Sequence, residues 1–352
     1  MDRREAVDRV GAFVQHHFLL LVLAAYAAAA VAPAAGVAAA KVTLVRILVY
    51  GQSMSITLPM LLLAGLLLNA GLAVKAAELK KVVRRPHVAL AGLVLNLLLP
   101  IGFVALLHQA LRHWHNSRET QELIIGLAVV AAMPVAGSST AWSQHAGGNV
   151  ALSLGLVVLS TVFSPITTPI VLTAFGSLAD GYGASLLTDL GGCRSGVFLA
   201  LCVVVPSLAG MIIGPGLSAD QRAWLRQRAK LFNSLALLFL CYANAAGSLP
   251  QVFGQPDWDF LALVLAGATA LCVVAFAAGW LLARLLKVDE PQQRSLMFGL
   301  GMNNNGTGLV LASTCMVGSP GAVLPVLVYN LVQHLVAGEV KRSFASRDRE
   351  VS

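Results

Sequence analysis

The chain has 352 residues, of which 57% are hydrophobic and only 11% are charged, and its formal net charge is +8. Because a soluble domain carries about 25% charged residues, this composition excludes a soluble globular protein and indicates a membrane protein. The five cysteines are scattered without a CxxC spacing, which argues against a disulfide framework or a cysteine metal site.

Ten apolar segments are predicted to cross the membrane as helices. Stretches such as Thr57–Val74 and Phe260–Leu286 can span a hydrocarbon layer of about 30 Å, and they lack the alternating pattern of a barrel strand. The moderately apolar stretch 36–53 is interpreted as an interfacial connection, with a short eleventh element left open. The predicted spans are residues 17–34, 54–74, 87–109, 121–145, 149–176, 195–217, 230–249, 258–286, 294–316 and 320–339.

Lysine and arginine in the loops predict the orientation. With ten spans, both termini and the even-numbered loops share one side, which holds 19 of the 24 Lys and Arg residues. The positive-inside rule makes that side cytoplasmic, so we expect a cell (inner) membrane protein with both termini inside and a cytoplasmic tail at 340–352. This asymmetry explains the basic charge without a nucleic-acid partner. The side includes Arg3, Arg4, Arg9, Lys75, Lys80, Lys81, Arg84 and Arg85.

The spans divide into two halves of five, residues 1–176 and 195–339, joined by the polar loop 176–194. An odd number of spans in each half inserts the second half upside down relative to the first. Inverted repeats of this kind are common in secondary transporters. The sequence therefore predicts a five-plus-five inverted repeat of transmembrane helices.

The fourth span of each half is interrupted by small and polar residues. Met133–Asn149 reads MPVAGSSTAWSQHAGGN, and Gly299–Gly308 reads GLGMNNNGTG. Pro134 removes a backbone donor, and the glycines favour an open backbone that survives in a membrane only where it lines protein or a watery cavity. Each break also creates a half-helix N-terminus that favours an anion. Two breaks at matching positions predict a binding site near the membrane midplane.

Several stretches resemble the bile acid:sodium symporter family. Leu61–Pro100 is similar to its second and third spans, with their basic loop and Arg-Pro, and Gly147–Leu172 to its fourth-to-fifth span junction. Gly301–Ala312 resembles its ninth-span crossover, and Tyr329–Gly338 its last span. The resemblance covers residues 54–340 and implies ten helices with crossing, broken fourth and ninth helices. It also implies a core of spans 3–5 and 8–10 and a panel of spans 1, 2, 6 and 7.

The resemblance further implies an organic anion as solute, coupled to two sodium ions. The family's third-span glutamine matches Asn96, its Ser-Asn pair at the fourth span matches Ser139 and Thr140, and a fifth-span hydroxyl matches Ser153. Its ninth-span Gln-Asn pair matches Asn303 and Asn304. The next fifth-span hydroxyl falls on Val157, and the glutamate that touches both ions falls on Gly299. Because a carboxylate offsets much of a cation's dehydration cost, sodium coupling stays open beside proton coupling, uncoupled diffusion and exchange.

The leading hypothesis is a secondary active transporter that moves a small organic anion by alternating access, without an organic cofactor. We expect the solute at the half-helix N-termini, near Ser138, Ser139, Asn304 and Asn305. In the last span Asn330, Gln333 and His334 share one helical face, which suits either a proton relay or hydrogen bonds between helices.

Two other classes of function compete with a transporter. An enzyme would need a nucleophile–base or paired-carboxylate constellation, and the sequence shows none. The remaining alternative is a non-transporting membrane receptor or scaffold. The sequence makes no prediction of the oligomeric state.

Overall fold

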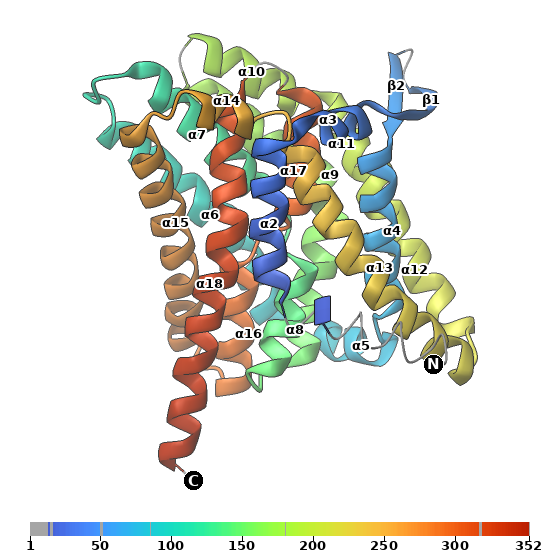
Figure 1. The fold of residues 1–352 in the computed structure, drawn as a ribbon. Coiled ribbons are helices and arrows are strands. Elements are labelled where there is room, and N and C mark those ends of the chain that lie inside the picture. The colour runs from blue at the N-terminus through green and yellow to red at the C-terminus, as the bar shows by residue number, and fades with distance from the viewer. Residues whose placement is uncertain are drawn as a thin grey trace. The chain divides into compact units, whose positions relative to one another are not determined.

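The computed structural model describes residues 13–14, 17–49, 52–84, 86–179, 181–316 and 319–351. The predicted cytoplasmic residues Arg3, Arg4, Arg9 and Arg85 lie outside these ranges. The described chain is mostly helical, with one antiparallel hairpin (Figure 1). It divides into two compact units. The first comprises Met1–Lys75, Val197–Pro256 and Leu309–Pro320, and the second Ala76–Gly196, Asp257–Gly308 and Gly321–Ser352.

The first unit begins with two helices that meet at a sharp bend. The chain turns by 94° between α2 (Phe18–Val31) and α3 (Pro33–Lys41). Tyr242 holds this bend, because its hydroxyl donates to the Ala32 carbonyl over 2.7 Å and accepts from the Gly36 N–H over 3.1 Å. The prediction of one uninterrupted span over 17–34 is therefore wrong at its end, since Pro33 starts a new helix in a new direction.

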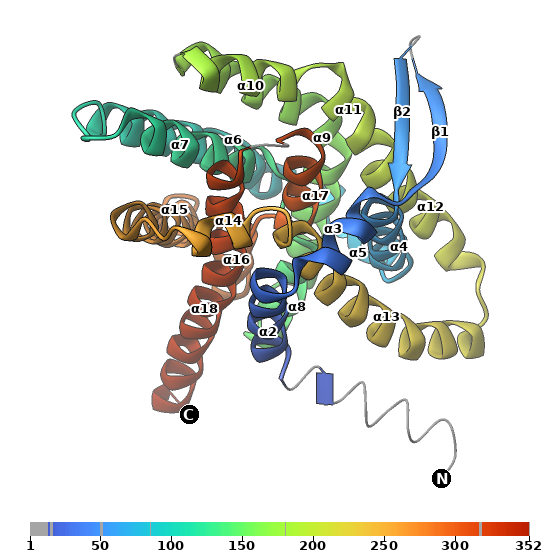
Figure 2. The ribbon, with the colours of Figure 1, turned by 45° about the horizontal axis from the view of Figure 1, so that its top comes forward.

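A β-hairpin follows where the sequence predicted an interfacial connection. Strands β1 (Thr43–Val49) and β2 (Gln52–Thr57) pair antiparallel, with Val49 opposite Gln52 and Thr43 opposite Thr57. The hairpin stands next to α4 (Leu58–Leu72) (Figure 2). The predicted all-α class therefore fits the described chain except for this one hairpin. The second apolar helix begins at Leu58, whereas the sequence predicted a start at residue 54. The segment is short and rich in β-branched residues, which fit a strand better than a helix.

Three later elements of the first unit, over residues 200–204, 205–213 and 219–245, pack on α4. At two glycines the backbones of α4 and α12 almost touch, because a Cβ at Gly71 would lie 2.1 Å from the Ser207 carbonyl oxygen and one at Gly210 2.2 Å from that of Leu68. Only glycine fits such an approach. Helix α11 (Cys193–Leu199) leads from the second unit into the first. The elements that follow it in the first unit are η1 (Ala200–Val204), α12 (Val205–Ile213), η2 (Gly214–Gly216), α13 (Ala219–Ala245) and α14 (Leu249–Gly254).

The second unit carries the two interrupted spans. One of its elements corrects the sequence interpretation, because α10 (Gly181–Gly191) is a helix inside the predicted loop 176–194. Helix α18 (Pro320–Val351) includes most of the segment 340–352, whose cytoplasmic location stays a prediction. The others are α5 (Ala76–Arg84), α6 (Pro86–Ala110), α7 (Ser117–Ala132), α8 (Gly137–His145), α9 (Val150–Leu178), α15 (Trp258–Leu285), α16 (Glu290–Gly301) and α17 (Asn305–Cys315), whose last seven residues belong to the first unit.

Helix length and composition agree with a membrane protein. Among the described residues, five helices are long and apolar enough to cross a bilayer, and the bent pair α2–α3 makes a sixth if it counts as one span. The predicted class, a multi-pass helical membrane protein, is confirmed. The ten-span inverted repeat stays a prediction, because α7, α8, α16 and α17 are each shorter than a single span.

Candidate functional site

The two interrupted helices meet within the second unit. Residues 133–136 link α7 to α8, residues 302–304 link α16 to α17, and the two links run antiparallel with Val135 opposite Asn303. In the following they are called the crossover. Two backbone hydrogen bonds join them: Ala136 N–H to the Met302 oxygen (2.9 Å) and Asn304 N–H to the Pro134 oxygen (2.8 Å). The unwound backbone is thus satisfied by protein, as burial in a membrane requires.

Three side chains from neighbouring helices hold the crossover in place. Gln333 of α18 accepts the Asn303 N–H over 3.0 Å, and Ser160 of α9 accepts the Val135 N–H over 3.0 Å. The Tyr329 hydroxyl, one turn before Gln333, donates to the Gly301 carbonyl over 3.4 Å. Of these three residues, only Gln333 lies on the polar helix face that the sequence predicts. Ser160 and Tyr329 carry no signal of their own there, since isolated polar residues in apolar spans are common.

Each link starts a helix, and the two N-termini differ. α8 has no side-chain cap at Ala136; the Ser139 N–H donates to the Ala136 carbonyl over 3.0 Å, and the Gly137 and Ser138 N–H groups before it receive no cap from the Ala136 side chain. At α17 the Asn304 carboxamide oxygen accepts the Thr307 N–H over 3.2 Å. Asn304, predicted to bind both solute and ion, therefore acts as a helix cap. The α8 N-terminus is the better place for an anion.

Buried polar atoms without a hydrogen-bond partner gather on α6, α8, the crossover and α17. Leaving such an atom unpaired costs about 1–3 kcal/mol, so each is available to a cation or to a hydrogen-bonding solute. Four of the six predicted ion-binding residues and two of the four predicted substrate residues belong to this set. Among the described residues, it contains Asn96 Oδ1, His108 Nδ1, Ser139 Oγ, Thr140 Oγ1, Asn303 Oδ1, Asn305 Oδ1 and Nδ2, and Thr307 Oγ1.

Ser153 lies in a different hydrogen-bond network. Its hydroxyl donates to Ser143 over 2.8 Å, and Ser143 is bonded to Ser295 of α16 over 2.9 Å. Next to them the Arg294 guanidinium donates to the Ala146 carbonyl over 2.7 Å, where a cation is favoured at the end of α8. Ser153 thus fixes the last turn of α8. Ser138, the remaining predicted substrate residue, is exposed on the first turn of α8.

An apolar side chain fills the space beside Gly299. A Cβ at this glycine would lie 2.7 Å from Cδ1 of Leu156, which is completely buried. Leu156 belongs to an apolar cluster that also contains Leu152 and Leu300. No acidic residue occurs in the segments 133–149 and 299–308. The crossover therefore offers amide and backbone groups to a ligand, and the first turns of α8 and α17 add hydroxyl groups.

Comparison with known proteins identifies the family of the chain. The Sodium Bile acid symporter family matches residues 60–255, more than half of the chain. The chain belongs to this family. Its members are transport proteins, so the prediction that the chain is not an enzyme is confirmed.

The chain is similar to proteins from bacteria and from plants. Bacillus subtilis YbaS, an uncharacterized protein, is 29% identical over 61% of this chain and 66% of its own length. B. subtilis YocS, an uncharacterized sodium-dependent transporter, is 24% identical over 80% and 81%. Arabidopsis thaliana BASS1, a probable chloroplastic sodium/metabolite cotransporter, is 29% identical over 61% and 50%. The match thus spans just under two thirds of YbaS and half of BASS1.

Proposed function

We propose that the chain is a secondary active transporter that moves a small organic anion across the cell membrane by alternating access. The uncapped N-terminus of α8, beside buried unpaired groups of Ser139 and Asn305, carries this proposal. Helix N–H groups and neutral donors bind a carboxylate or sulfonate without a basic side chain. The compact second unit, with both breaks inside it, supports its action as one body that changes position relative to the first during transport.

We further propose that a monovalent cation accompanies the solute. Asn96, Ser139, Thr140 and Asn303 each hold a buried, unpaired oxygen, and oxygen is the ligand that sodium prefers. The names of YocS and BASS1 support sodium as the ion.

Proton coupling, uncoupled diffusion or exchange is the alternative. The surroundings of Gly299 favour this alternative. Leu156 fills the space beside Gly299, and no carboxylate there offsets the dehydration cost of a bound cation.

Transport into liposomes tests both proposals. Purified protein is reconstituted, and uptake of a panel of organic anions is measured in sodium chloride and in choline chloride at fixed pH. We expect uptake of at least one anion, and a loss in choline. If no anion is moved, the proposal of a transporter is wrong and the hypothesis of a non-transporting receptor or scaffold remains. If uptake is equal in the two salts, cation coupling by sodium is wrong and the transporter stands.

A pair of serine variants ties the activity to the crossover. Ser139→Ala removes a buried, unpaired hydroxyl and should abolish uptake of the transported anion. Ser177→Ala removes a hydroxyl that bonds only to the Ala174 carbonyl of its own helix at the exposed end of α9, and should leave uptake unchanged. Equal loss in both variants would contradict the assignment.

A further inference from the structure

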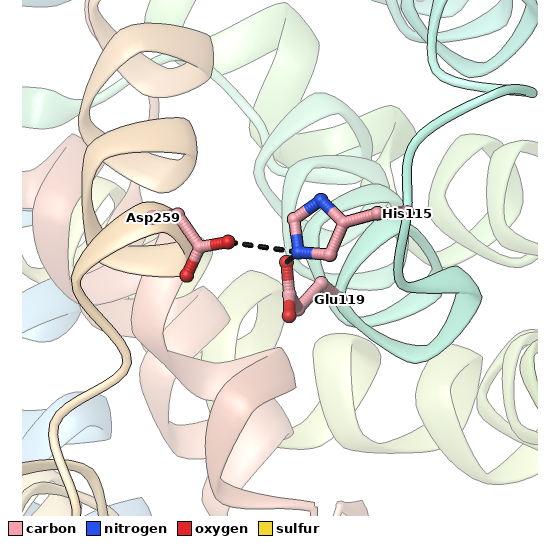
Figure 3. Close-up of side chains that lie close together, drawn as sticks. All are labelled: His115, Glu119 and Asp259. Atoms are coloured by element: carbon pink, nitrogen blue, oxygen red, sulfur yellow. Dashed lines mark ion pairs between the residues drawn. The ribbon is translucent and has the colours of Figure 1, made fainter.

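A second cluster of polar side chains lies where α7 and α15 begin. α7 has 16 residues. At 1.5 Å per residue it places this cluster about 24 Å from the crossover. Figure 3 shows His115 ahead of α7, Glu119 in the first turn of α7 and Asp259 in the first turn of α15, all pointing toward one another. One ligand atom from each lies within 4.8 Å of the others. His115 Nε2 is 2.8 Å from Asp259 Oδ2 and 4.0 Å from Glu119 Oε2.

Glu119 is buried and held in one position. It is only 5% exposed, and the Trp114 indole N–H donates to its Oε2 over 2.7 Å. The Asn116 side-chain amide donates to its other oxygen, Oε1. Both donors are neutral, and each carboxyl oxygen of Glu119 keeps a free lone pair. Carboxylates that bind metals are typically fixed by such outer hydrogen bonds.

Negative charge around His115 exceeds the positive charge. Asp257, the N-cap residue of α15, adds a third carboxyl group two residues before Asp259. Two arginines lie three residues from His115: Arg118 pairs with Glu122 over 3.2 Å, and Arg112 donates to the Gln109 side chain over 3.2 Å. The carboxyl groups of Glu119 and Asp259 thus both face the single imidazole of His115. A divalent cation would relieve this crowding more fully.

We propose that His115, Glu119 and Asp259 bind a divalent transition-metal ion of the Zn²⁺ type. One imidazole nitrogen with two carboxylate oxygens suits such an ion, whereas Mg²⁺ prefers oxygen ligands alone. The side chains of His115 and Asp259 are 61% and 50% exposed, so the ion enters from solution and water completes its coordination. The ion would join the start of α7 to the start of α15 within the second unit. On the proposed orientation, it binds outside the cell.

Zinc binding by the purified protein tests this proposal. The full chain, without an affinity tag and stripped with EDTA, is incubated with zinc chloride or magnesium chloride. We expect one zinc ion per chain after desalting, measured by elemental analysis, and a rise of several degrees in melting temperature. Magnesium at the same concentration should change neither value. No retained zinc and no shift in melting temperature would overturn the site.

Variants separate a metal site from a simple ion pair. His115→Ala and Asp259→Asn change exposed side chains and should each lose both the bound zinc and the thermal shift. His113→Ala removes an exposed histidine two residues earlier and should keep both. If His115→Ala lowers the melting temperature but the zinc-dependent shift persists, the cluster is an ion pair only and the proposal is wrong.

Discussion

The buried hydroxyl of Thr307 is the sharpest single-residue test of the crossover. It has no hydrogen-bond partner among the described residues, although its side chain is completely buried. Thr307→Val keeps the shape and removes an unpaired polar atom, so stability should stay equal or rise by up to about 1 kcal/mol. If the hydroxyl binds the solute, affinity should fall about tenfold. Thermal unfolding with and without the transported anion measures both quantities.

Thr314→Val on the same helix is the matched control. Its hydroxyl donates to the Val310 carbonyl over 2.7 Å and is exposed, so neither stability nor affinity should change much. A similar loss of affinity in both variants would show that α17 responds as a whole and that Thr307 has no special contact.

A carboxylate at residue 299 tests why the crossover is neutral. Gly299→Glu should lower the unfolding free energy by about 3 kcal/mol, because its side chain meets buried Leu156 and its charge has no partner. Adding Leu156→Ala makes room for the carboxylate, and this double variant should be stabilised by sodium chloride more than by choline chloride. Leu156→Ala alone is the control. If sodium chloride stabilises the double variant no more than choline chloride does, the cavity beside residue 299 is not an ion site.

At the scale of helices, α18 acts as the support of the crossover. Gln333→Leu leaves the buried Asn303 N–H without an acceptor, which should lower the unfolding free energy by about 1–3 kcal/mol. Uptake should fall further than the remaining folded fraction explains, because the crossover loses its position. Gln251→Leu, at an exposed site of α14, should change neither. Equal stability of the two variants in denaturant would contradict a supporting role for α18.

At the scale of the whole molecule, the orientation places the β-hairpin outside and the end of α18 inside. Leu48 of β1 is 80% exposed, and Ser346 lies exposed near the end of α18. In intact cells a membrane-impermeant maleimide should label Leu48→Cys at once and Ser346→Cys only after permeabilisation. The unmodified chain gives the background from its five cysteines. The reverse pattern would invert the proposed topology.

Sequence reasoning identified the helix breaks because Pro134 and the glycines near residue 301 act locally on the backbone. It missed α10, whose glycine-rich segment is helical only through packing: a Cβ at Gly191 would lie 2.4 Å from the Thr173 hydroxyl of α9. It also began the seventh span at residue 230, whereas α13 starts after a capping box between Ser218 and Gln221. Hydropathy reports where a helix is apolar, and capping reports where it starts.

The site residues were predicted less completely for a similar reason. Residue type alone predicts Ser153 and Asn304 as ligands, and this stays a prediction: the Ser153 hydroxyl donates to Ser143, and the Asn304 oxygen accepts the Thr307 N–H. Which hydroxyl or amide is left unpaired depends on helix packing, and no pattern in one sequence shows that. Thr307 is in this respect the clearest addition from the structure, since it is buried and its hydroxyl is unpaired.

The neutral crossover has an electrical consequence. Residues 133–144 and 299–308 contain no ionisable side chain. In the proposed cycle the empty site therefore returns without moving charge, although each elementary charge is worth about 2.3 kcal/mol per 100 mV of membrane potential. One monovalent anion with one monovalent cation would cross as an electrically silent pair, and a second cation would generate current. Current recorded from reconstituted protein would therefore count the cations carried with each anion.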